Sequence, residues 1–116
     1  MISAADDPLK LGFFFGLLVT KGSFGGDGLE PSVTVRMHTG HEELFRWLEY
    51  EFPGGKLYGP YTHRGSPYFQ WMVRGRYLRE VLAPLINRYR QLLDEHAETR
   101  FDSMCERYRI ALPAPV

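Results

Sequence analysis

The sequence has one cysteine, no net charge and no apolar run of membrane-spanning length. Cys105 cannot form an internal disulfide and has no metal-type CxxC spacing, so we expect a reduced, cytoplasmic setting. The longest apolar stretch, residues 11–19, has nine residues where a membrane helix needs about 20, which predicts no membrane partner. Asp6 and Asp7 precede this stretch where an export signal carries basic residues, so we expect no export.

Charge is balanced overall but uneven along the chain. The 14 Lys and Arg residues equal the 14 Asp and Glu residues, which excludes a globally basic chain. Residues 31–90, however, carry nine basic and five acidic side chains. Such an excess fits an ordinary solvated surface as well as a binding site for a polyanion. Where these basic residues lie on the folded protein distinguishes the two. The length of 116 residues predicts a single domain, residues 1–116, with a modest core that favours association.

The order of helix and strand patterns predicts an α+β fold. The expected elements are a helix over residues 8–20, strands over 23–24 and 32–38, a helix over 41–52, strands over 56–61 and 68–74, and helices beyond Gly75. Thr39 or Gly40 is expected to cap the second helix, and Pro84 to break or kink a later one. The order αββαββαα predicts a four-stranded antiparallel sheet with helices on one face and an open face on the other.

Strand alternation assigns side chains to the open face. In residues 32–38 the apolar Val33, Val35 and Met37 are expected to face the helices, so their neighbours face outward. The same rule applied to the second hairpin, with His63 and Arg64 added at its tip, completes an outward set: Ser32, Thr34, Arg36, His38, Lys56, Tyr58, His63, Arg64, Tyr68, Gln70, Met72 and Arg74. Arginine suits guanine and glutamine suits adenine in the major groove, which favours DNA readout. The alternative is an ordinary exposed sheet face, which carries the same residue types.

The first predicted helix has a narrow face of small residues. Gly12, Gly16 and Thr20 recur every four residues and lie along one stripe, with Phe13 and Leu17 beside it. A smooth stripe on an otherwise apolar helix suits close packing against another helix, and a second copy of the chain is a natural partner. These five residues form the predicted dimer interface. The alternative is that the glycines fit beneath the chain's own strands.

The stretch Gly-Leu-Leu-Val-Thr-Lys-Gly-Ser-Phe, residues 16–24, resembles the LAGLIDADG motif with its usual Gly-Ser-Phe continuation. Later segments agree, including Gly-Gly-Lys-Leu-Tyr at residues 54–58 and Trp-Met-Val-Arg-Gly at residues 71–75. The element order is similar to one LAGLIDADG homing-endonuclease domain. The resemblance implies a saddle-shaped sheet over the major groove and, with one motif per chain, a homodimer whose motif helices pack at the two-fold axis. It also implies a pseudo-palindromic double-stranded DNA site of about 20 base pairs.

The motif departs from the family at the last position before its glycine. Active relatives carry an acidic residue there to hold Mg²⁺, whereas this chain has Lys21. Because an ammonium group cannot ligate a cation, we expect no catalytic residue, metal or cofactor at this position. Lys21 suits a phosphate instead. The alternative is a solvated lysine at a helix C-terminus, where a cation is favoured by about 0.3–1 kcal/mol.

The leading hypothesis is a homodimer that binds double-stranded DNA without cutting it and regulates transcription, in the cytoplasm and on the nucleoid if the host is bacterial. Its DNA-binding residues are expected to be the outward set together with Lys21, Ser23 and Asp27. Further candidates for phosphate contact in the last helices are Arg88, Arg90 and Arg100. Two alternatives stay open: a nuclease that holds its metal with Asp27 or Glu30, and a protein-binding α/β module.

Overall fold

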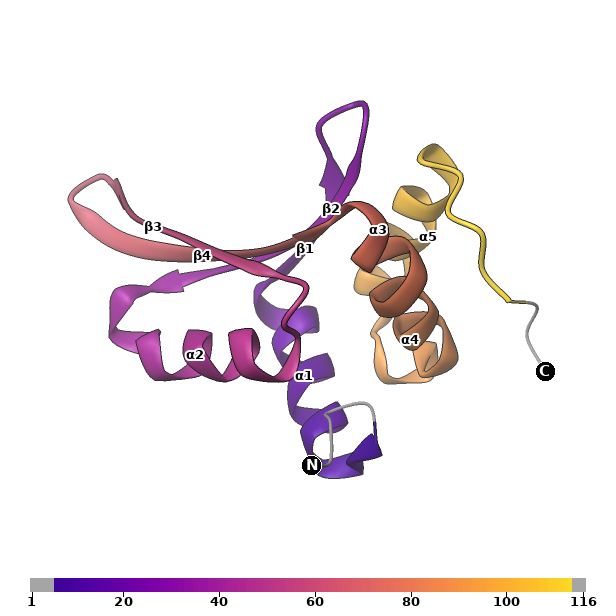
Figure 1. Ribbon diagram of the computed structural model, residues 1–116, viewed down its shortest axis with the longest axis horizontal. Coiled ribbons are helices and arrows are strands. Elements are labelled where there is room, and N and C mark those ends of the chain that lie inside the picture. Colours follow the sequence, from indigo (N-terminus) through magenta and orange to yellow (C-terminus); the bar gives the residue numbers. More distant parts are fainter. Residues whose placement is uncertain (1–5, 114–116) are drawn as a thin grey trace.

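The computed structural model describes residues 6–113, which form a four-stranded antiparallel sheet with helices on one face (Figure 1). The strands are β1 (Gly22–Gly26), β2 (Pro31–His38), β3 (Lys56–His63) and β4 (Ser66–Arg74), in the spatial order β1-β2-β4-β3. The helices are α1 (Pro8–Lys21), α2 (Glu42–Glu51), α3 (Gly75–Tyr77), α4 (Ala83–Arg88) and α5 (Glu95–Arg107). The expected α+β architecture is confirmed. In the described part of the chain, every helix is too short or too polar to cross a membrane.

The two ends of α1 follow from local chemistry. The Asp7 carboxylate accepts hydrogen bonds from the backbone N–H groups of Leu9 at 2.9 Å and Lys10 at 3.3 Å. At the other end, a Cβ on Gly22 would lie 2.5 Å from the Leu18 carbonyl oxygen, so only glycine lets β1 begin directly after α1. This tight junction fixes Lys21, the last residue of α1, at the edge of the sheet.

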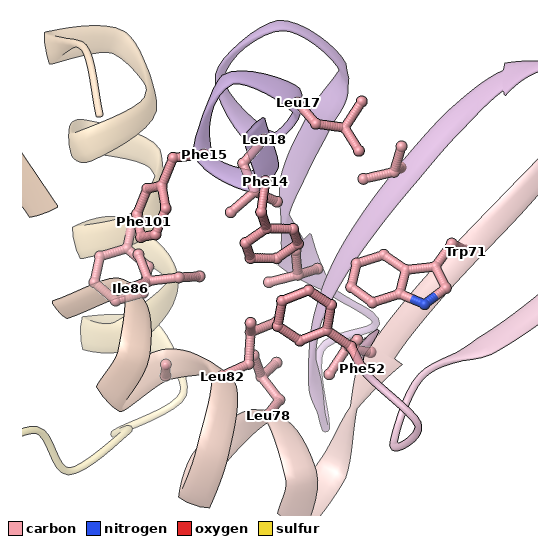
Figure 2. Close-up of a cluster of buried hydrophobic side chains, with 14 of the residues drawn as sticks. Phe14, Phe15, Leu17, Leu18, Phe52, Trp71, Leu78, Leu82, Ile86 and Phe101 are labelled. Carbon is pink, nitrogen blue, oxygen red and sulfur yellow. The ribbon is translucent and has the colours of Figure 1, made fainter. Parts of the chain in front are cut away.

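An aromatic cluster holds α1 between the sheet and the other helices (Figure 2). The rings of Phe14 and Phe52 stack with centroids 4.2 Å apart, and Trp71 of β4 packs edge-on to both. On the far side of the core, Phe24 of β1 contacts Phe101 of α5 with centroids 5.9 Å apart. Because these contacts join helices α1 and α5 to the sheet, they fix the inner face of the sheet and leave the outer face free.

One local expectation holds only in part, and another was wrong. The helix does not break at Pro84 but changes its geometry there: Pro84 lies in the first turn of α4, which continues from a π-helical turn over Leu78–Leu82. There the Ala83 N–H donates to the Leu78 carbonyl, and this wider turn accommodates a proline that has no N–H of its own. Neither Thr39 nor Gly40 caps α2, because both lie in a 3-10 turn over Thr39–His41 that precedes it; Nδ1 of His38 accepts the Gly40 N–H at 2.9 Å and caps that turn.

The lone cysteine is a core residue, and its titration gives a test of the fold. Cys105 is 7% exposed, and burial together with the nearby Asp102 carboxylate raises the pKa of its thiol to about 11, from 9.0 in its ordinary state. Above pH 9 the unfolded chain therefore releases a proton that the folded chain retains, and stability falls as pH rises toward 11.

We expect the free energy of unfolding to fall by about 1 kcal/mol more in the wild type than in Cys105→Ser between about pH 8 and pH 10. Urea unfolding of both proteins at the two pH values measures the difference. Equal pH dependence in the two proteins would show that the thiol titrates normally in the folded state.

Candidate nucleic-acid interface

The outer face of the sheet presents its side chains in rows that cross the strands. Directly paired residues of antiparallel strands point to the same face, so the strand register defines each row. The first row is Ser23, Thr34, Met72 and Lys56; the second is Arg36, Gln70 and Tyr58; the third includes His38 and Tyr68; and Ser32 pairs with Arg74 beyond the first. The opposite face holds the fully buried Val33, Val35, Trp71 and Val73, which confirms the facing that alternation predicted.

Arg36 and Gln70 are joined across β2 and β4. Oε1 of Gln70 accepts a hydrogen bond from Nε of Arg36, and Gln70 is only 9% exposed. This hydrogen bond uses one of the two lone pairs of the amide oxygen, so Gln70 orients Arg36, and the adenine contact expected of Gln70 stays a prediction. The guanidinium of Arg36 keeps both Nη groups free of hydrogen bonds to residues 6–113.

A β-bulge brings a further side chain, Tyr61, to the outer face. Tyr58 pairs with Gln70 and Tyr61 with Tyr68, so β3 uses one more residue than β4 over this interval. Strict alternation from Tyr58 would turn Tyr61 inward, and sequence reasoning missed it for that reason. The signal was the Gly59-Pro60 pair inside the strand, because glycine and proline within a strand mark bulges. The ring of Tyr61 lies 5.6 Å from that of Tyr68 and is 44% exposed.

The β3–β4 hairpin forms a long arm that curves away from the helices (Figure 1). Arg64 and Gly65 at its tip have φ values of 52° and 80°, the left-handed pair typical of a two-residue hairpin turn. His63 and Arg64 are both exposed there, as expected. A hollow of about 360 Å³ lies on this arm and is lined by Arg36, Met37, His38, His63, Ser66 and Tyr68.

Lys21 is exposed at the junction of α1 and β1, next to Ser23 at the start of the first row. Its ammonium forms no ion pair or hydrogen bond with any part of the chain that the structure describes. Beside this junction, a hollow of about 370 Å³ is lined in part by Thr20 and Ser23 and by His96 and Arg100 from α5. The end of α1 therefore lies near the Arg100 guanidinium and two hydroxyl groups, beside apolar side chains of α1, β1 and α5.

The two carboxylates considered as metal ligands have other partners. Oδ1 of Asp27 accepts hydrogen bonds from the N–H groups of Leu29 at 2.9 Å and Glu30 at 2.7 Å. These bonds lower the pKa of Asp27 and make its carboxylate part of the β1–β2 turn. Glu30 lies 4.0 Å from Arg79. Within residues 6–113, no three His, Cys, Asp or Glu side chains are grouped so that they could hold a metal ion.

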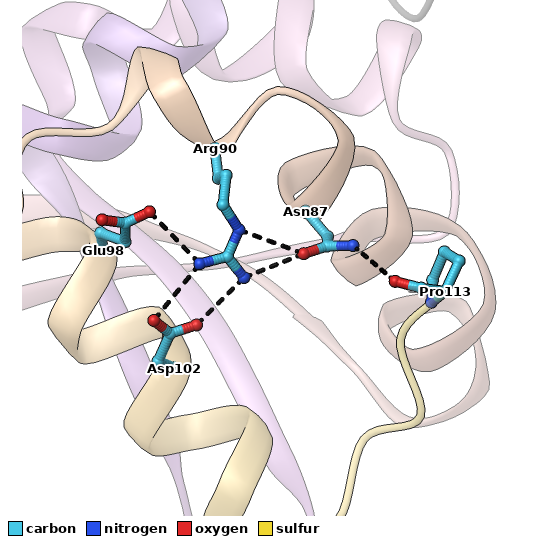
Figure 3. A network of polar contacts seen from close by, with 5 residues as sticks. All are labelled: Asn87, Arg90, Glu98, Asp102 and Pro113. Carbon is cyan, nitrogen blue, oxygen red and sulfur yellow. Dashed lines mark hydrogen bonds and ion pairs between the residues drawn. The ribbon is translucent and has the colours of Figure 1, made fainter. Parts of the chain in front are cut away.

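The basic residues of the last helices divide into occupied and free groups. Arg90 donates to Asn87, to Glu98 at 3.2 Å and to Asp102 at 3.1 Å, so it links α4 to α5 rather than facing a ligand (Figure 3). Arg88 lies over the ring of Tyr89, 5.3 Å from its centroid. Arg88 and Arg100 are both exposed, and neither makes a hydrogen bond or ion pair with the described residues, so both are available to an anion.

The small-residue stripe of α1 faces outward from the protomer. A Cβ on Gly12 or Gly16 would meet nothing within 4 Å, so these glycines do not fit beneath the chain's own strands. Phe13 is 50% exposed, and Thr20 is exposed while its hydroxyl bonds the Gly16 carbonyl at 2.8 Å. Leu17 is different: it is 9% exposed and belongs to the protomer's own core, which corrects its place in the predicted interface.

Comparison with solved structures identifies the fold. The meganuclease I-SmaMI bound to uncleavable DNA matches with a TM-score of 0.66 and 16% identity over 86% of this chain. The group I intron-encoded homing endonuclease I-CeuI in complex with DNA matches with a TM-score of 0.58 and 13% identity over 89% of this chain. The chain has the LAGLIDADG homing-endonuclease fold. The architecture implied by the motif at residues 16–24 is thereby confirmed.

The match is partial in length and distant in sequence. This chain spans 35% of the I-SmaMI chain and 56% of the I-CeuI chain. A mutant of I-SmaMI matches similarly, with a TM-score of 0.64 and 15% identity. No protein-family model matches the sequence, and no curated protein matches it. At these identities the comparison establishes the shared fold, and the residues of this chain must carry any inference about activity.

Proposed function

We propose that this chain is a sequence-specific double-stranded DNA-binding protein that acts as a homodimer, does not cut its site, and regulates transcription. The observation that carries the proposal is the position of Lys21. Its ammonium is exposed at the junction of α1 and β1 and forms no hydrogen bond or ion pair with residues 6–113. In the LAGLIDADG motif this position holds the metal-binding acid. A fixed cation there is suited to hold a phosphate, which contributes affinity in a salt-dependent way.

The outer face of the sheet supports DNA as the ligand. Its rows combine cations with hydroxyl, amide and imidazole groups. Two exposed carboxylates lie at its edge: Asp27 accepts hydrogen bonds within the β1–β2 turn, and Glu30 lies 4.0 Å from Arg79. The two hairpins rise beside this face, away from α1 and α2, which gives the sheet its saddle shape (Figure 1). Arg36 is oriented by Gln70 and keeps both Nη groups free of hydrogen bonds to residues 6–113, which suits contact with a guanine.

The outward stripe of α1 supports a homodimer. Gly12 and Gly16 are open to the outside of the protomer, and Phe13 adds exposed apolar surface beside them. Small residues let two helices approach closely, and a two-fold contact needs only one self-complementary patch. Two saddles related in this way would cover about 20 base pairs of a pseudo-palindromic site.

The Mg²⁺ ions that the fold family implies do not fit the residues at the end of α1. Lys21 is positively charged and would repel a cation. Asp27 uses a carboxylate oxygen to hold the β1–β2 turn, and Glu30 faces Arg79. A divalent cation needs several protein ligands, and within residues 6–113 no three His, Cys, Asp or Glu side chains are grouped so that they could supply them. We therefore propose binding without hydrolysis.

Selection from a random-sequence duplex library with purified protein, without Mg²⁺, tests the proposal. We expect enrichment of a pseudo-palindromic site, bound by two copies of the chain, and no product bands when Mg²⁺ or Mn²⁺ is added to that duplex. Product bands would instead establish an active nuclease. Failure to enrich any duplex would exclude DNA binding and favour a protein-binding module. Regulation is tested by placing the selected site in a promoter and measuring transcription with and without the protein.

The Arg36–Gln70 pair gives a prediction about specificity. In Gln70→Leu the guanidinium of Arg36 loses its positioning hydrogen bond, so discrimination at the base pair that Arg36 contacts should weaken. A two-point contact is worth about 1–3 kcal/mol of discrimination, and we expect Arg36→Ala to remove it and Gln70→Leu to remove part of it at the same position.

Binding to single-base variants of the selected site measures the effect. Gln91→Leu, which changes an exposed glutamine in the helix layer, is the matched control and should keep the wild-type preferences. If Gln70→Leu altered a different base pair from Arg36→Ala, the two residues would act independently.

A further inference from the structure

The turn between β1 and β2 exposes a leucine on the side of the sheet that faces away from α1 and α2 (Figure 1). Leu29 is 84% exposed, although its neighbours in the turn, Asp27, Gly28 and Glu30, are all polar or lack a side chain. Full exposure means that Leu29 adds nothing to the core of this chain. A large apolar group in this position gains free energy only by contact with another molecule.

The turn is held rigidly. Asp27 accepts the N–H groups of Leu29 and Glu30, and its own N–H donates to the Glu30 carbonyl at 3.1 Å. The Gly28 N–H donates to the hydroxyl of Tyr108, at the end of α5, at 3.0 Å. Hydrogen bonds on both sides of Leu29 fix its backbone, so binding through its side chain requires little ordering of the turn.

The surroundings of the turn define the ligand. A hollow of about 330 Å³ between the turn and the outer face is lined by Asp27, Glu30, Arg36, Arg74 and others. Of these charged groups, Asp27 accepts the N–H groups of the turn and Glu30 lies 4.0 Å from Arg79, which leaves Arg36 and Arg74 to face a ligand that combines phosphates with apolar groups. In the major groove the apolar group that distinguishes one base from another is the C5 methyl of thymine, and 5-methylcytosine carries a methyl at the same ring position.

We propose that Leu29 is a specificity-determining residue that contacts the C5 methyl group of a pyrimidine in the DNA site. This inference rests on the proposed DNA-binding function. Because each protomer carries one such tip, a homodimer contacts two symmetry-related pyrimidines, one in each half-site. Leu29 contacts the methyl group and makes no hydrogen bond to the base, so removing that methyl group is enough to lower the binding affinity.

Replacing each thymine of the selected duplex in turn by deoxyuridine tests the proposal, since it removes only the methyl group. We expect wild-type affinity to fall by about fourfold at one thymine of each half-site, the scale of one buried methyl, and Leu29→Ala to show no such fall at that position. Leu92→Ala changes an exposed leucine of the helix layer and should keep the wild-type pattern. With cytosine at that position, C5 methylation should strengthen binding by the wild type and not by Leu29→Ala.

The possible outcomes separate this inference from the proposed function. A selected duplex whose deoxyuridine variants all bind equally well, or a methyl effect that persists in Leu29→Ala, overturns the role of Leu29 and leaves DNA binding intact. Selection of no duplex at all overturns both. Thermal unfolding of Leu29→Ala should match that of the wild type, because the side chain is almost fully exposed.

Discussion

Replacing Gly16 by leucine is expected to give a folded monomer with strongly weakened DNA binding. A side chain at this position meets nothing within 4 Å in the protomer, and leucine favours a helix over glycine by about 1 kcal/mol. The protomer should therefore keep its fold. Across a two-fold axis, however, the leucines of two α1 helices would hold the backbones apart. Loss of the second half-site contact should weaken binding to the full site by about a hundredfold or more.

Light scattering gives the mass, and gel shift on the selected duplex gives the affinity. The melting temperature of the wild type should rise with protein concentration, whereas that of Gly16→Leu should not, because only a dimer links folding to association. Ser103→Leu adds the same bulk to an exposed position on α5 and is the matched control. If Gly16→Leu had the same mass and DNA affinity as the wild type, the dimer contact would not lie at this face of α1.

Much of the fold could be predicted because local and long-range signals agree. The helix predicted over residues 8–20 corresponds to α1, and it begins there because the Asp7 carboxylate accepts two of its first backbone N–H groups. Val33 and Val35 are fully buried, as alternation required, because one face of β2 packs against the helices. The four-residue spacing of Gly12 and Gly16 predicted that they share one face of α1. Whether that face points to the sheet or to the outside of the protomer depends on how α1 lies on the sheet, which the spacing does not determine.

The parts that could not be predicted depend on contacts between distant residues or on departures from regular geometry. The bulge at Gly59-Pro60 turns Tyr61 to the outer face, which period-2 reasoning cannot reproduce. The π-helical turn ahead of Pro84 absorbs the missing N–H and keeps the helix intact. Gln70 and Arg36 are separated by 34 residues, so their hydrogen bond, which gives Gln70 a role in positioning Arg36, follows only from the strand register.

Replacing Lys21 by alanine is expected to flatten the salt dependence of DNA binding. A homodimer has two such lysines, and each phosphate contact with B-DNA contributes about 0.9 to the slope of log affinity against log salt, so the slope should fall by about 1.8. Between about 50 and 200 mM salt, the ratio of wild-type to variant affinity should then shrink by about twelvefold. Lys21→Glu places two negative charges near the same phosphates and should weaken binding further at low salt.

The slope, and not the affinity alone, separates phosphate contact from the other roles open to Lys21. A solvated lysine at the end of α1 would leave the slope unchanged on replacement, because no counterion release depends on it. Damage to the fold would lower the affinity for DNA without a specific change in the salt slope. Such damage is not expected in Lys21→Ala, because Lys21 is exposed and its ammonium forms no hydrogen bond or ion pair with the residues described. Arg46→Ala is the matched control, since Arg46 lies on α2 and is engaged by Glu42 and Glu49. Its slope should equal that of the wild type, so equal slopes for Lys21→Ala and Arg46→Ala would show that no phosphate is held at Lys21.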